Sequence, residues 1–271
     1  MNVPPLTWLY VPGDRPDRVE KAIASGAHAV IVDLEDGVAP AAKAEARGNL
    51  PALLGQRRDK PVYVRVNAGD ADDLDVVATL AIEGVHVPKV AGPGDVPSID
   101  RPVHCLIESA AGVEAAFEIA TTRGVAGISL GEADLRSETG ALEAGLDWAR
   151  GRIVNAAVAA GLPRPPQSVY PHLNDDEGLA RSCLRGRELG HLGRSAIHPA
   201  QLAIIERAYL PTEEETARAR ATVEQLEQAL GAATLAGGEF VDAAMLGGAR
   251  QTIALAERFG TAAPGTVSVD D

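Results

Sequence analysis

Short runs of apolar, mostly β-branched residues alternate along the chain with longer segments of helical periodicity. The runs are nearly continuous in apolar character, which is typical of parallel strands that are buried on both faces. Together the alternating runs predict an α/β protein built on a parallel sheet. The eight runs are Trp8–Val11, Ala29–Val32, Val62–Val66, Val85–Val87, Val103–Ile107, Val125–Leu130, Ser168–Tyr170 and Ser195–Ile197.

The segments between these runs carry signals for helix starts and stops. Pro16 stands in the first turn of the first predicted helix, and Gly26 follows its end. Ser109 is placed to cap the helix that follows the fifth run, and Asp175 stands at the start of a later one. The stretch 140–160 predicts the longest helix of this region. Each strand is therefore followed by a helical connection or a loop.

Eight βα units in this length favour a closed (β/α)₈ TIM barrel over an open, doubly wound sheet. No Gly-x-Gly-x-x-Gly follows the first strand, which weakens the open-sheet alternative. The pattern changes at Pro211-Thr212, where a charged, Ala-rich helix begins; a Gly-rich break and a last helix follow. We predict a TIM barrel over residues 1–210 and a C-terminal helical extension over residues 211–271.

Composition argues against several classes of function. The 271 residues contain 25 Lys and Arg against 38 Asp and Glu, a formal net charge of −13, which argues against nucleic-acid binding. No run approaches the roughly 20 apolar residues of a membrane span, and no signal peptide is evident. The two cysteines, Cys105 and Cys183, supply no disulfide framework. We expect a soluble, cytoplasmic protein that binds neither nucleic acid nor a membrane.

Charged residues stand where the predicted strands end. The carboxyl ends of barrel strands meet at one face, where the active sites of this architecture lie. Charges that converge on one pocket are costly unless they are paired or bind a metal, so this arrangement predicts a functional site. The residues concerned are Asp33, Glu35, Asp36, Arg65, Lys89, Glu108 and Asp134.

Glu108 and Asp134 follow neighbouring strands. Two carboxylates directed at one point repel each other unless a cation lies between them. A site of carboxylate oxygens without Cys or His suits Mg²⁺ better than Zn²⁺. Glu35 and Asp36 could orient the waters of such an ion. The alternative is that Glu108 and Asp134 only cap the helices that follow them.

Arg65 is a cation on a strand beside the predicted metal site. It could recognise a substrate carboxylate or carbonyl, or pair with Asp33 or Glu35, and the two roles are compatible. We interpret Asp33 as a residue that braces the barrel by pairing with an arginine. Lys89 could contact a substrate or pair with a neighbouring carboxylate.

An ordered set of motifs resembles the citrate lyase β-subunit-like family of the HpcH/HpaI aldolase superfamily over nearly the whole chain. The motifs are Tyr10–Pro16, Val32–Val38 with Lys43 and Arg47 downstream, Val64–Asn67, Val87–Lys89, Leu106–Ser109, Gly131–Leu135, Ile197–Gln201 and Gly238–Asp242. Three positions depart from the family pattern. Gln167 and Glu138 stand where the family often has Asp, and Phe240 stands where Met is usual.

The resemblance implies a TIM barrel with a C-terminal helical extension, assembled as a trimer or a multiple of one. It also implies Mg²⁺ held by Glu108 and Asp134, with Arg65 next to the reacting carbonyl. In this family the loop that matches Val241-Asp242 completes the site of a neighbouring subunit, so Asp242 is our candidate acid/base. From the residues alone, an Asp in a Gly-rich loop is usually a turn or cap residue.

The family acts on β-hydroxyacyl thioesters such as malyl-CoA, citramalyl-CoA or citryl-CoA, with reversible cleavage of a C–C bond. Arg15, Lys43 and Arg47 are candidates for contacts with the phosphates of CoA, although Lys43 and Arg47 could equally form a solvated helix face. Two other interpretations stay open. One is a pyruvate-type aldolase that acts on free hydroxy-keto acids without CoA, and the other is a non-catalytic acyl-thioester-binding subunit.

Overall fold

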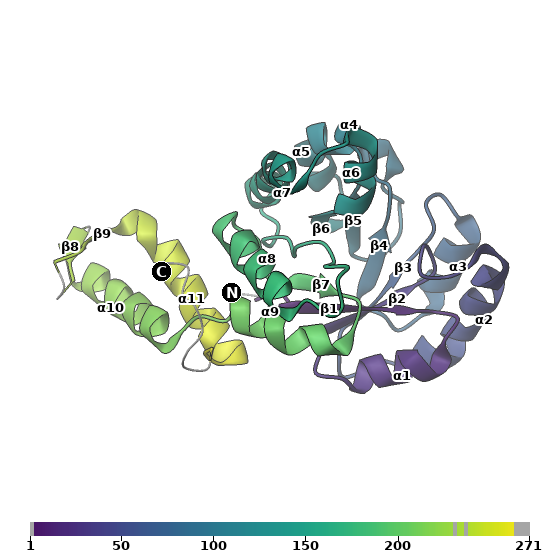
Figure 1. Ribbon diagram of the computed structural model, residues 1–271, viewed down its shortest axis with the longest axis horizontal. Coiled ribbons are helices and arrows are strands. Elements are labelled where there is room, and N and C mark those ends of the chain that lie inside the picture. The colour runs from purple at the N-terminus through teal and green to yellow at the C-terminus, as the bar shows by residue number, and fades with distance from the viewer. Residues whose placement is uncertain (1–2, 230–231, 236–237, 263–271) are drawn as a thin grey trace. The chain divides into compact units, whose positions relative to one another are not determined.

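The computed structural model describes residues 3–229, 232–235 and 238–262. The chain divides into two compact units (Figure 1). One is Pro5–Ile205, and the other comprises the described residues of Met1–Pro4 and Glu206–Asp271. The end of the predicted C-terminal extension, 263–271, lies outside the described residues. In the part of the chain that the structure describes, no helix has both the length and the apolar character that a membrane crossing requires.

The larger unit contains a sheet of seven parallel strands in the order β6-β5-β4-β3-β2-β1-β7. Every residue of β2 is buried, as expected for a strand covered on both faces. The predicted α/β class and the parallel sheet are therefore confirmed. The strands are β1 (Thr7–Pro12), β2 (Ala29–Asp33), β3 (Val62–Arg65), β4 (Gly84–Val87), β5 (Val103–Ile107), β6 (Val125–Leu130) and β7 (Arg194–Ala196).

The predicted strand at Ser168–Tyr170 is absent. A single parallel bridge, Gln167 to Arg194 of β7, stands in its place. Pro165 and Pro166 come directly before it and have no backbone N–H to donate, so a regular ladder cannot extend there. Among the described residues no strand pairing joins β6 to this segment, and the closed eight-stranded barrel stays a prediction.

The helices of the larger unit lie along the outside of the sheet (Figure 1). Within the described residues, four short 3₁₀ helices occur among these connections and a fifth in the smaller unit: η1 (Pro40–Ala42), η2 (Pro93–Asp95), η3 (Glu143–Leu146), η4 (Pro199–Gln201) and η5 (Ala243–Met245). The α-helices in the described part of the chain are α1 (Pro16–Ala24), α2 (Lys43–Leu54), α3 (Ala71–Thr79), α4 (Ala110–Glu114), α5 (Ala116–Ala120), α6 (Glu132–Thr139), α7 (Asp147–Ala159), α8 (Asp176–Glu188), α9 (Leu202–Tyr209), α10 (Glu213–Ala229) and α11 (Leu246–Phe259).

The predicted cap at Ser109 and the predicted helix start at Asp175 are present, and one other predicted helix start is wrong. Ser109 Oγ accepts a hydrogen bond from Gly112 N (3.1 Å), and Asp175 Oδ1 accepts one from Gly178 N (2.9 Å). The helix predicted from residue 140 begins only at Asp147, after η3. Gly140 has φ +69°, so it ends α6 in the left-handed conformation instead of starting a helix.

Side chains at equivalent register positions of a parallel sheet point to the same side of it. Asp33 is opposite Arg65, and Arg65 is opposite His86. Earlier along the strands on the same face, Trp8 and Tyr63 pack in a buried cluster with ring centroids 5.1 Å apart. Large aromatic side chains therefore fill the space beneath the charged residues at the strand ends.

The smaller unit packs α10 against α11. Thr212 and Glu215 form a capping box at the start of α10, with Thr212 Oγ1 accepting from Glu215 N (3.0 Å) and Glu215 Oε2 accepting from Thr212 N (2.8 Å). An antiparallel pair of short strands, β8 (Ala232–Thr234) and β9 (Phe240–Asp242), joins the two helices. This hairpin was not among the elements expected from the sequence.

Candidate functional site

A cavity of about 450 Å³ opens at the carboxyl ends of the strands. Five of the charged residues predicted from the sequence line it: Asp33, Asp36, Arg65, Glu108 and Asp134. A second cavity of about 300 Å³ shares three of them and adds others: Asp36, Glu108 and Asp134, with Lys89, Ser109 and Glu138. The predicted convergence of charge at the strand ends is therefore present in the structure.

Arg65 is held in place by two buried acids. Its Nε and Nη2 atoms each donate to one oxygen of Asp33, both at 2.6 Å, and Nη1 lies 3.1 Å from Glu35 Oε2. The guanidinium also lies over the ring of Tyr10, 5.0 Å from its centroid. Burial lowers the pKa of Arg65, but the hydrogen bonding to Asp33 and the charges of Asp33 and Glu35 together outweigh it and hold the pKa above its usual value. Three of its five N–H groups contact these acids, which leaves two for a ligand in the cavity.

Glu35 binds a second cation, because Lys89 Nζ donates to its Oε1. The Glu35 side chain is only 4% exposed, and its charge is shared between Arg65 and Lys89. Asp36 is exposed and lies 3.9 Å from Lys89 Nζ. Glu35 is therefore a bracing residue for the two cations, whereas Asp36 is accessible from both cavities.

Glu108 is buried in the cavity wall, where Lys89 N donates to its Oε2 (2.9 Å). Burial raises the pKa of the carboxyl to about 7; the Lys89 N–H opposes this effect, and the charge of Asp134 adds to it. A Cβ placed on Gly131 would collide with Cγ and Oε1 of Glu108. Glycine at this position therefore makes room for the carboxylate.

These residues fit a hard cation. Glu108 and Asp134 line the same cavity, and the charge of Asp134 disfavours the charged form of Glu108. Within the described residues no cluster of three or more His, Cys, Asp or Glu is arranged as a complete metal site. A donor set of two carboxylates suits Mg²⁺, which keeps several waters or accepts oxygens from a substrate. The fit thus rests on the two predicted ligands together with oxygens from outside the protein.

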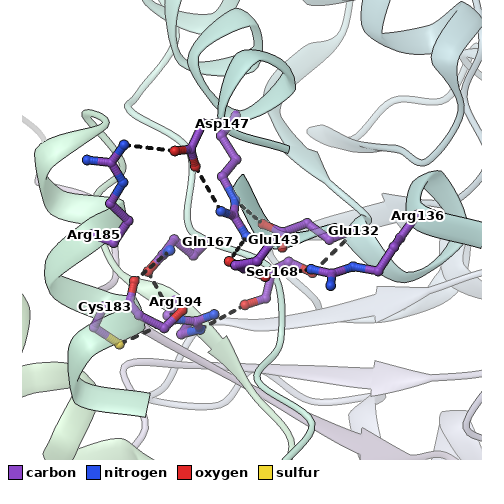
Figure 2. Close-up of polar contacts among 11 residues, drawn as sticks. Glu132, Arg136, Glu143, Asp147, Gln167, Ser168, Cys183, Arg185 and Arg194 are labelled. Carbon is purple, nitrogen blue, oxygen red and sulfur yellow. Dashed lines mark hydrogen bonds and ion pairs between the residues drawn. The ribbon is translucent and has the colours of Figure 1, made fainter. Parts of the chain in front are cut away.

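One wall of the larger cavity is held by a network of ion pairs (Figure 2). Glu132 follows β6 and lines the cavity, and its carboxylate binds Arg150 of α7 through two hydrogen bonds of 2.9 and 2.6 Å. Arg150, which is 3% exposed, also contacts Glu143 (2.7 Å) and Asp147 (3.0 Å). Asp147 in turn accepts from Arg185 of α8 (2.8 Å). The network connects the end of β6 to α7 and α8.

A second group of contacts continues from α8 to β7 (Figure 2). Arg194 donates to Ser168 O (2.9 Å), Gln167 Oε1 (3.1 Å) and Ser182 Oγ (3.0 Å). Gln167 Nε2 donates back to Ser182 O (3.0 Å). Side chains on α7 and α8 therefore connect β6 and β7 on the side where the strand predicted at Ser168–Tyr170 does not form a ladder.

Arg47 contacts acids of the neighbouring helix rather than the cavity. It donates to Asp70 (2.9 Å), Asp72 (3.1 Å) and Asp73 (2.6 Å), at the start of α3. The hydrogen bond to the buried Asp73 is the main reason that the pKa of Arg47 is raised. This arrangement fixes α2 against α3, a role that the sequence did not reveal.

The other two cations expected to meet CoA phosphates have weaker partners. Arg15 is exposed and lies 3.5 Å from Asp17. Lys43 donates to Asn67 Oδ1, which is next to the strand end that carries Arg65. Neither residue lines the two cavities. Their role as CoA ligands stays a prediction.

Asp242 lies in the smaller unit, at the end of β9. Its Oδ1 accepts a hydrogen bond from Ala244 N (3.0 Å), so it caps η5. Capping is the function expected for an Asp in such a loop from its residue type alone. The acid/base role stays a prediction.

Several residues at the cavity were not predicted from the sequence. Arg18 of α1 lines the cavity and makes no ion pair within the described residues. Its position three residues after Arg15, in the connection that follows β1, was the available signal. Ser129, Ser168 and Ser195 also line the cavity, but single serines near strand ends carry no distinctive pattern.

Comparison with known families identifies the chain. A sequence model described as HpcH/HpaI aldolase/citrate lyase matches residues 6–199, which is most of the larger unit. The chain belongs to the HpcH/HpaI aldolase/citrate lyase family. The resemblance stated from the sequence motifs is therefore confirmed.

Relatives of this family member cover nearly its whole length. It is 34% identical to a (3S)-malyl-CoA thioesterase of Cereibacter sphaeroides (strain ATCC 17029), over 92% of this chain and 93% of the relative. It is 35% identical to a citrate lyase subunit beta-like protein of Deinococcus radiodurans, over 92% and 98% of the two chains. The crystal structure of CitE from Mycobacterium tuberculosis with magnesium, acetoacetate and coenzyme A is similar with a TM-score of 0.81, at 33% identity over 93% and 98%.

In this HpcH/HpaI family member, two of the departures from the family pattern take structural roles. Glu138 Oε2 accepts a hydrogen bond from Ala110 N (2.9 Å) at the start of α4. Gln167 takes part in the contacts of Arg194 that were described above. Phe240 of β9 is largely exposed. None of the three contacts Glu108 or Asp134 among the hydrogen bonds of the described residues.

Proposed function

We propose that this protein is a Mg²⁺-dependent lyase that cleaves or forms a C–C bond of a short β-hydroxyacyl-CoA thioester, such as malyl-CoA, citramalyl-CoA or citryl-CoA. The observation that carries the proposal is the presence of Glu108, Asp134 and Arg65 around one cavity. The CitE complex with magnesium, acetoacetate and coenzyme A supports it, because those ligands combine a divalent ion, a small keto acid and CoA.

Glu108 and Asp134 would hold the cation in the cavity. The ion, when bound, supplies a Lewis acid that orients the carboxylate and hydroxyl oxygens of the substrate and draws negative charge to them. Lys89 N fixes Oε2 of Glu108, and Gly131 leaves space for its carboxyl. Asp36, which borders both cavities, is placed to orient water near the ion.

Arg65 supplies fixed positive charge in the same cavity. When the C–C bond breaks, its electron pair moves into the thioester group, and the resulting enolate oxygen needs a positioned donor. The contacts with Asp33 and Glu35 hold the guanidinium before the substrate arrives, so little reorganisation accompanies bond cleavage. Its two remaining N–H groups would donate to the thioester oxygen or the substrate carbonyl.

Proton transfer needs a base for the substrate hydroxyl and an acid for the enolate carbon. We assign this role to Asp242, acting on a neighbouring subunit of a homotrimer or a multiple of one. The family resemblance of the Gly238–Asp242 motif supports this assignment. The hydroxyl proton would pass to the Asp242 carboxylate as the hydroxyl carbon becomes a carbonyl, and a proton would then return to the enolate carbon.

We propose that Arg15, Lys43 and Arg18 bind the phosphates of CoA. Arg15 and Arg18 share the start of α1, and Arg18 reaches the cavity. Arg47 would have to leave three carboxylates to join them, so we assign it to the packing of α2 on α3. A cytoplasmic location follows as part of the same proposal, because CoA thioesters of this kind are intracellular metabolites.

Hydrolysis of the thioester is a second candidate, favoured by the name of the malyl-CoA thioesterase relatives. In that reaction malyl-CoA and water give malate and free CoA. In the C–C cleavage, malyl-CoA gives glyoxylate and acetyl-CoA, and the thioester bond is kept. Free thiol is therefore released only in hydrolysis.

A panel of hydroxyacyl-CoA thioesters, assayed with Mg²⁺ and with a chelator, tests the proposal. We expect keto-acid release with Mg²⁺ and its loss with the chelator. Appearance of thiol without keto acid would favour hydrolysis. Turnover of free hydroxy-keto acids alone would favour the pyruvate-type aldolase, and saturable CoA binding without turnover would favour the binding subunit.

The Glu108→Ala and Asp134→Ala variants test the two proposed metal ligands. Each should abolish turnover with the circular dichroism spectrum unchanged, because each removes a proposed metal ligand at the edge of the core. Mg²⁺-dependent turnover that persists in either variant would refute the assignment of that ligand.

A further inference from the structure

Lys89 has a left-handed backbone conformation, with φ +57°. It is the one residue other than glycine with positive φ in the part of the chain that the structure describes. Such a conformation costs free energy for a residue with a Cβ and is retained where the surrounding structure holds it. The contacts around Lys89 therefore hold it in this conformation.

The ladder between β4 and β5 changes register at this point. Val85 N donates to Pro102 O (3.0 Å), and in a regular parallel ladder Lys89 N would donate to Leu106 O four residues later. Instead Val90 N donates to Leu106 O (3.1 Å). The β4 side thus contains one extra residue, as in a bulge, and the backbone N–H of Lys89 does not take part in the ladder.

The N–H that leaves the ladder is used by Glu108. Lys89 N donates to Glu108 Oε2 (2.9 Å), whereas Oε1 of the same carboxylate accepts no hydrogen bond from the described residues. The Lys89 side chain points its ammonium to Glu35 instead. The backbone and the side chain of Lys89 therefore contact two different acids of the site.

We propose that Lys89 is a positioning residue whose bulged, left-handed backbone holds Glu108 in the orientation that a divalent cation needs, through its amide and not through its charge. This inference rests on the proposed function, since it takes Glu108 as a metal ligand. The ammonium group has the separate task of neutralising Glu35 together with Arg65.

The Lys89→Gly and Lys89→Pro variants separate the two contacts. Both lack the ammonium group. Gly keeps the N–H and adopts positive φ readily, whereas Pro has no N–H and has φ fixed near −65°. The measurement is the Mg²⁺ dissociation constant of the full-length protein by titration calorimetry, with the melting temperature recorded for every variant.

We expect Lys89→Gly to keep the Mg²⁺ dissociation constant within about threefold of the wild type. Lys89→Pro should raise it by about tenfold or more, toward the value for Glu108→Gln, as is typical when a residue that orients a metal ligand is lost. A purely structural role would lower the melting temperature of the Pro variant without this change in affinity.

Equal Mg²⁺ affinity in the Gly and Pro variants would overturn the inference and leave the proposed function intact. If Lys89→Pro does not fold, the Gly variant decides, because a loss of affinity as large as in Glu108→Gln would show that the ammonium is the group that matters. If the wild type binds no Mg²⁺ and needs none for turnover, the proposed function fails and the inference fails with it.

Discussion

At the scale of single residues, the ionisation of Glu108 depends on what shares its cavity. Burial raises the pKa of this carboxyl to about 7 from an ordinary value of 4.5, with a further contribution from Asp134. A carboxylate that is difficult to ionise in the metal-free protein becomes a good ligand once a cation compensates its charge. Its high pKa in the absence of metal is thus consistent with a metal-binding role.

The raised pKa of Glu108 predicts a pH dependence of stability. Between pH 4.5 and 7 the folded protein binds more protons at this group than the unfolded chain does, so the free energy of unfolding falls as the pH rises through this interval. The resulting loss of unfolding free energy is fully present above pH 7 and amounts to about 3 kcal/mol at most. Urea titrations of metal-free protein at pH 5 and pH 8 measure it.

Glu108→Gln is the control for this prediction, because it removes the titrating group and keeps the shape of the side chain. The difference in unfolding free energy between the two pH values should be smaller in the Gln variant than in the wild type. Identical pH dependence in both proteins would contradict the assigned shift. Added Mg²⁺ should stabilise the wild type at pH 8 more than the variant.

Gly131→Ala should damage the cation site without a large loss of stability. The new Cβ would collide with Cγ and Oε1 of Glu108, which must then move. We expect the Mg²⁺ concentration that gives half-maximal activity to rise by about tenfold or more. Gly48→Ala in α2, where the added Cβ meets nothing, is the control and should leave that concentration unchanged.

At the scale of elements, cations hold the ends of the first three helices. Lys60 donates to Ser25 O just after α1. Arg58 donates to Leu53 O in the last turn of α2 (2.6 Å). Arg101 donates to Ala78 O in the last turn of α3 (3.0 Å). These positions complement both the unpaired carbonyls and the partial negative charge of a helix C-terminus. Three of the four basic side chains around a small cavity there, Arg58, Lys60 and Arg101, are thus explained by helix capping.

The ion-pair network on α7 predicts two very different mutational effects. Arg150→Gln removes a buried cation from three carboxylates and should lower the free energy of unfolding by about 3–5 kcal/mol. Arg185→Gln removes a half-exposed partner of Asp147 and should cost about 1 kcal/mol or less. Urea denaturation of both variants checks the ranking, and equal effects would mean that Arg150 does not hold the network together.

Comparison of sequence and structure shows which features local patterns can reveal. The strands and the acids at their ends were predictable, because burial on both faces leaves a continuous apolar run and a charge after it is conspicuous. The pairing of Asp33 with Arg65 was also anticipated from their positions. Arg150 was not, since an arginine inside an Ala-rich helix resembles a solvated face until the partner helix is known.

Other features depend on tertiary geometry that no local pattern encodes. The left-handed Lys89 has no glycine to indicate it, and the role of Gly131 depends on where Glu108 points. Ser168–Tyr170 predicts a strand because it has an apolar centre, but the prolines before it lack the donors that a ladder needs. The hairpin of β8 and β9 is too short to give a clear alternation.

At the scale of the whole molecule, the proposed function requires more than one copy of the chain. Asp242 belongs to the smaller unit and Arg65 to the larger one. If Asp242 completes the site of another subunit, two different inactive variants can form one active site in a mixed oligomer. This is a test of assembly that does not depend on knowing the size of the oligomer.

Mixtures of Asp242→Asn and Arg65→Ala should therefore regain activity after the two proteins are unfolded and refolded together. The Asp242→Asn variant alone should lose turnover number far more than substrate affinity, since this residue is assigned to proton transfer. Activity of the mixture that stays at the level of the separate variants would argue that Asp242 acts within its own subunit or not at all.

The side chains that connect β6 to β7 have a consequence for how the molecule opens. Backbone hydrogen bonds tie each of the other strand pairs, so separating them means local unfolding, whereas β6 and the Gln167 segment can part by breaking a few side-chain contacts. Amide hydrogens along β6 should consequently exchange with deuterium sooner than those of β2 and β3. A large acyl group could then be admitted by widening this flank, with the remainder of the sheet undisturbed.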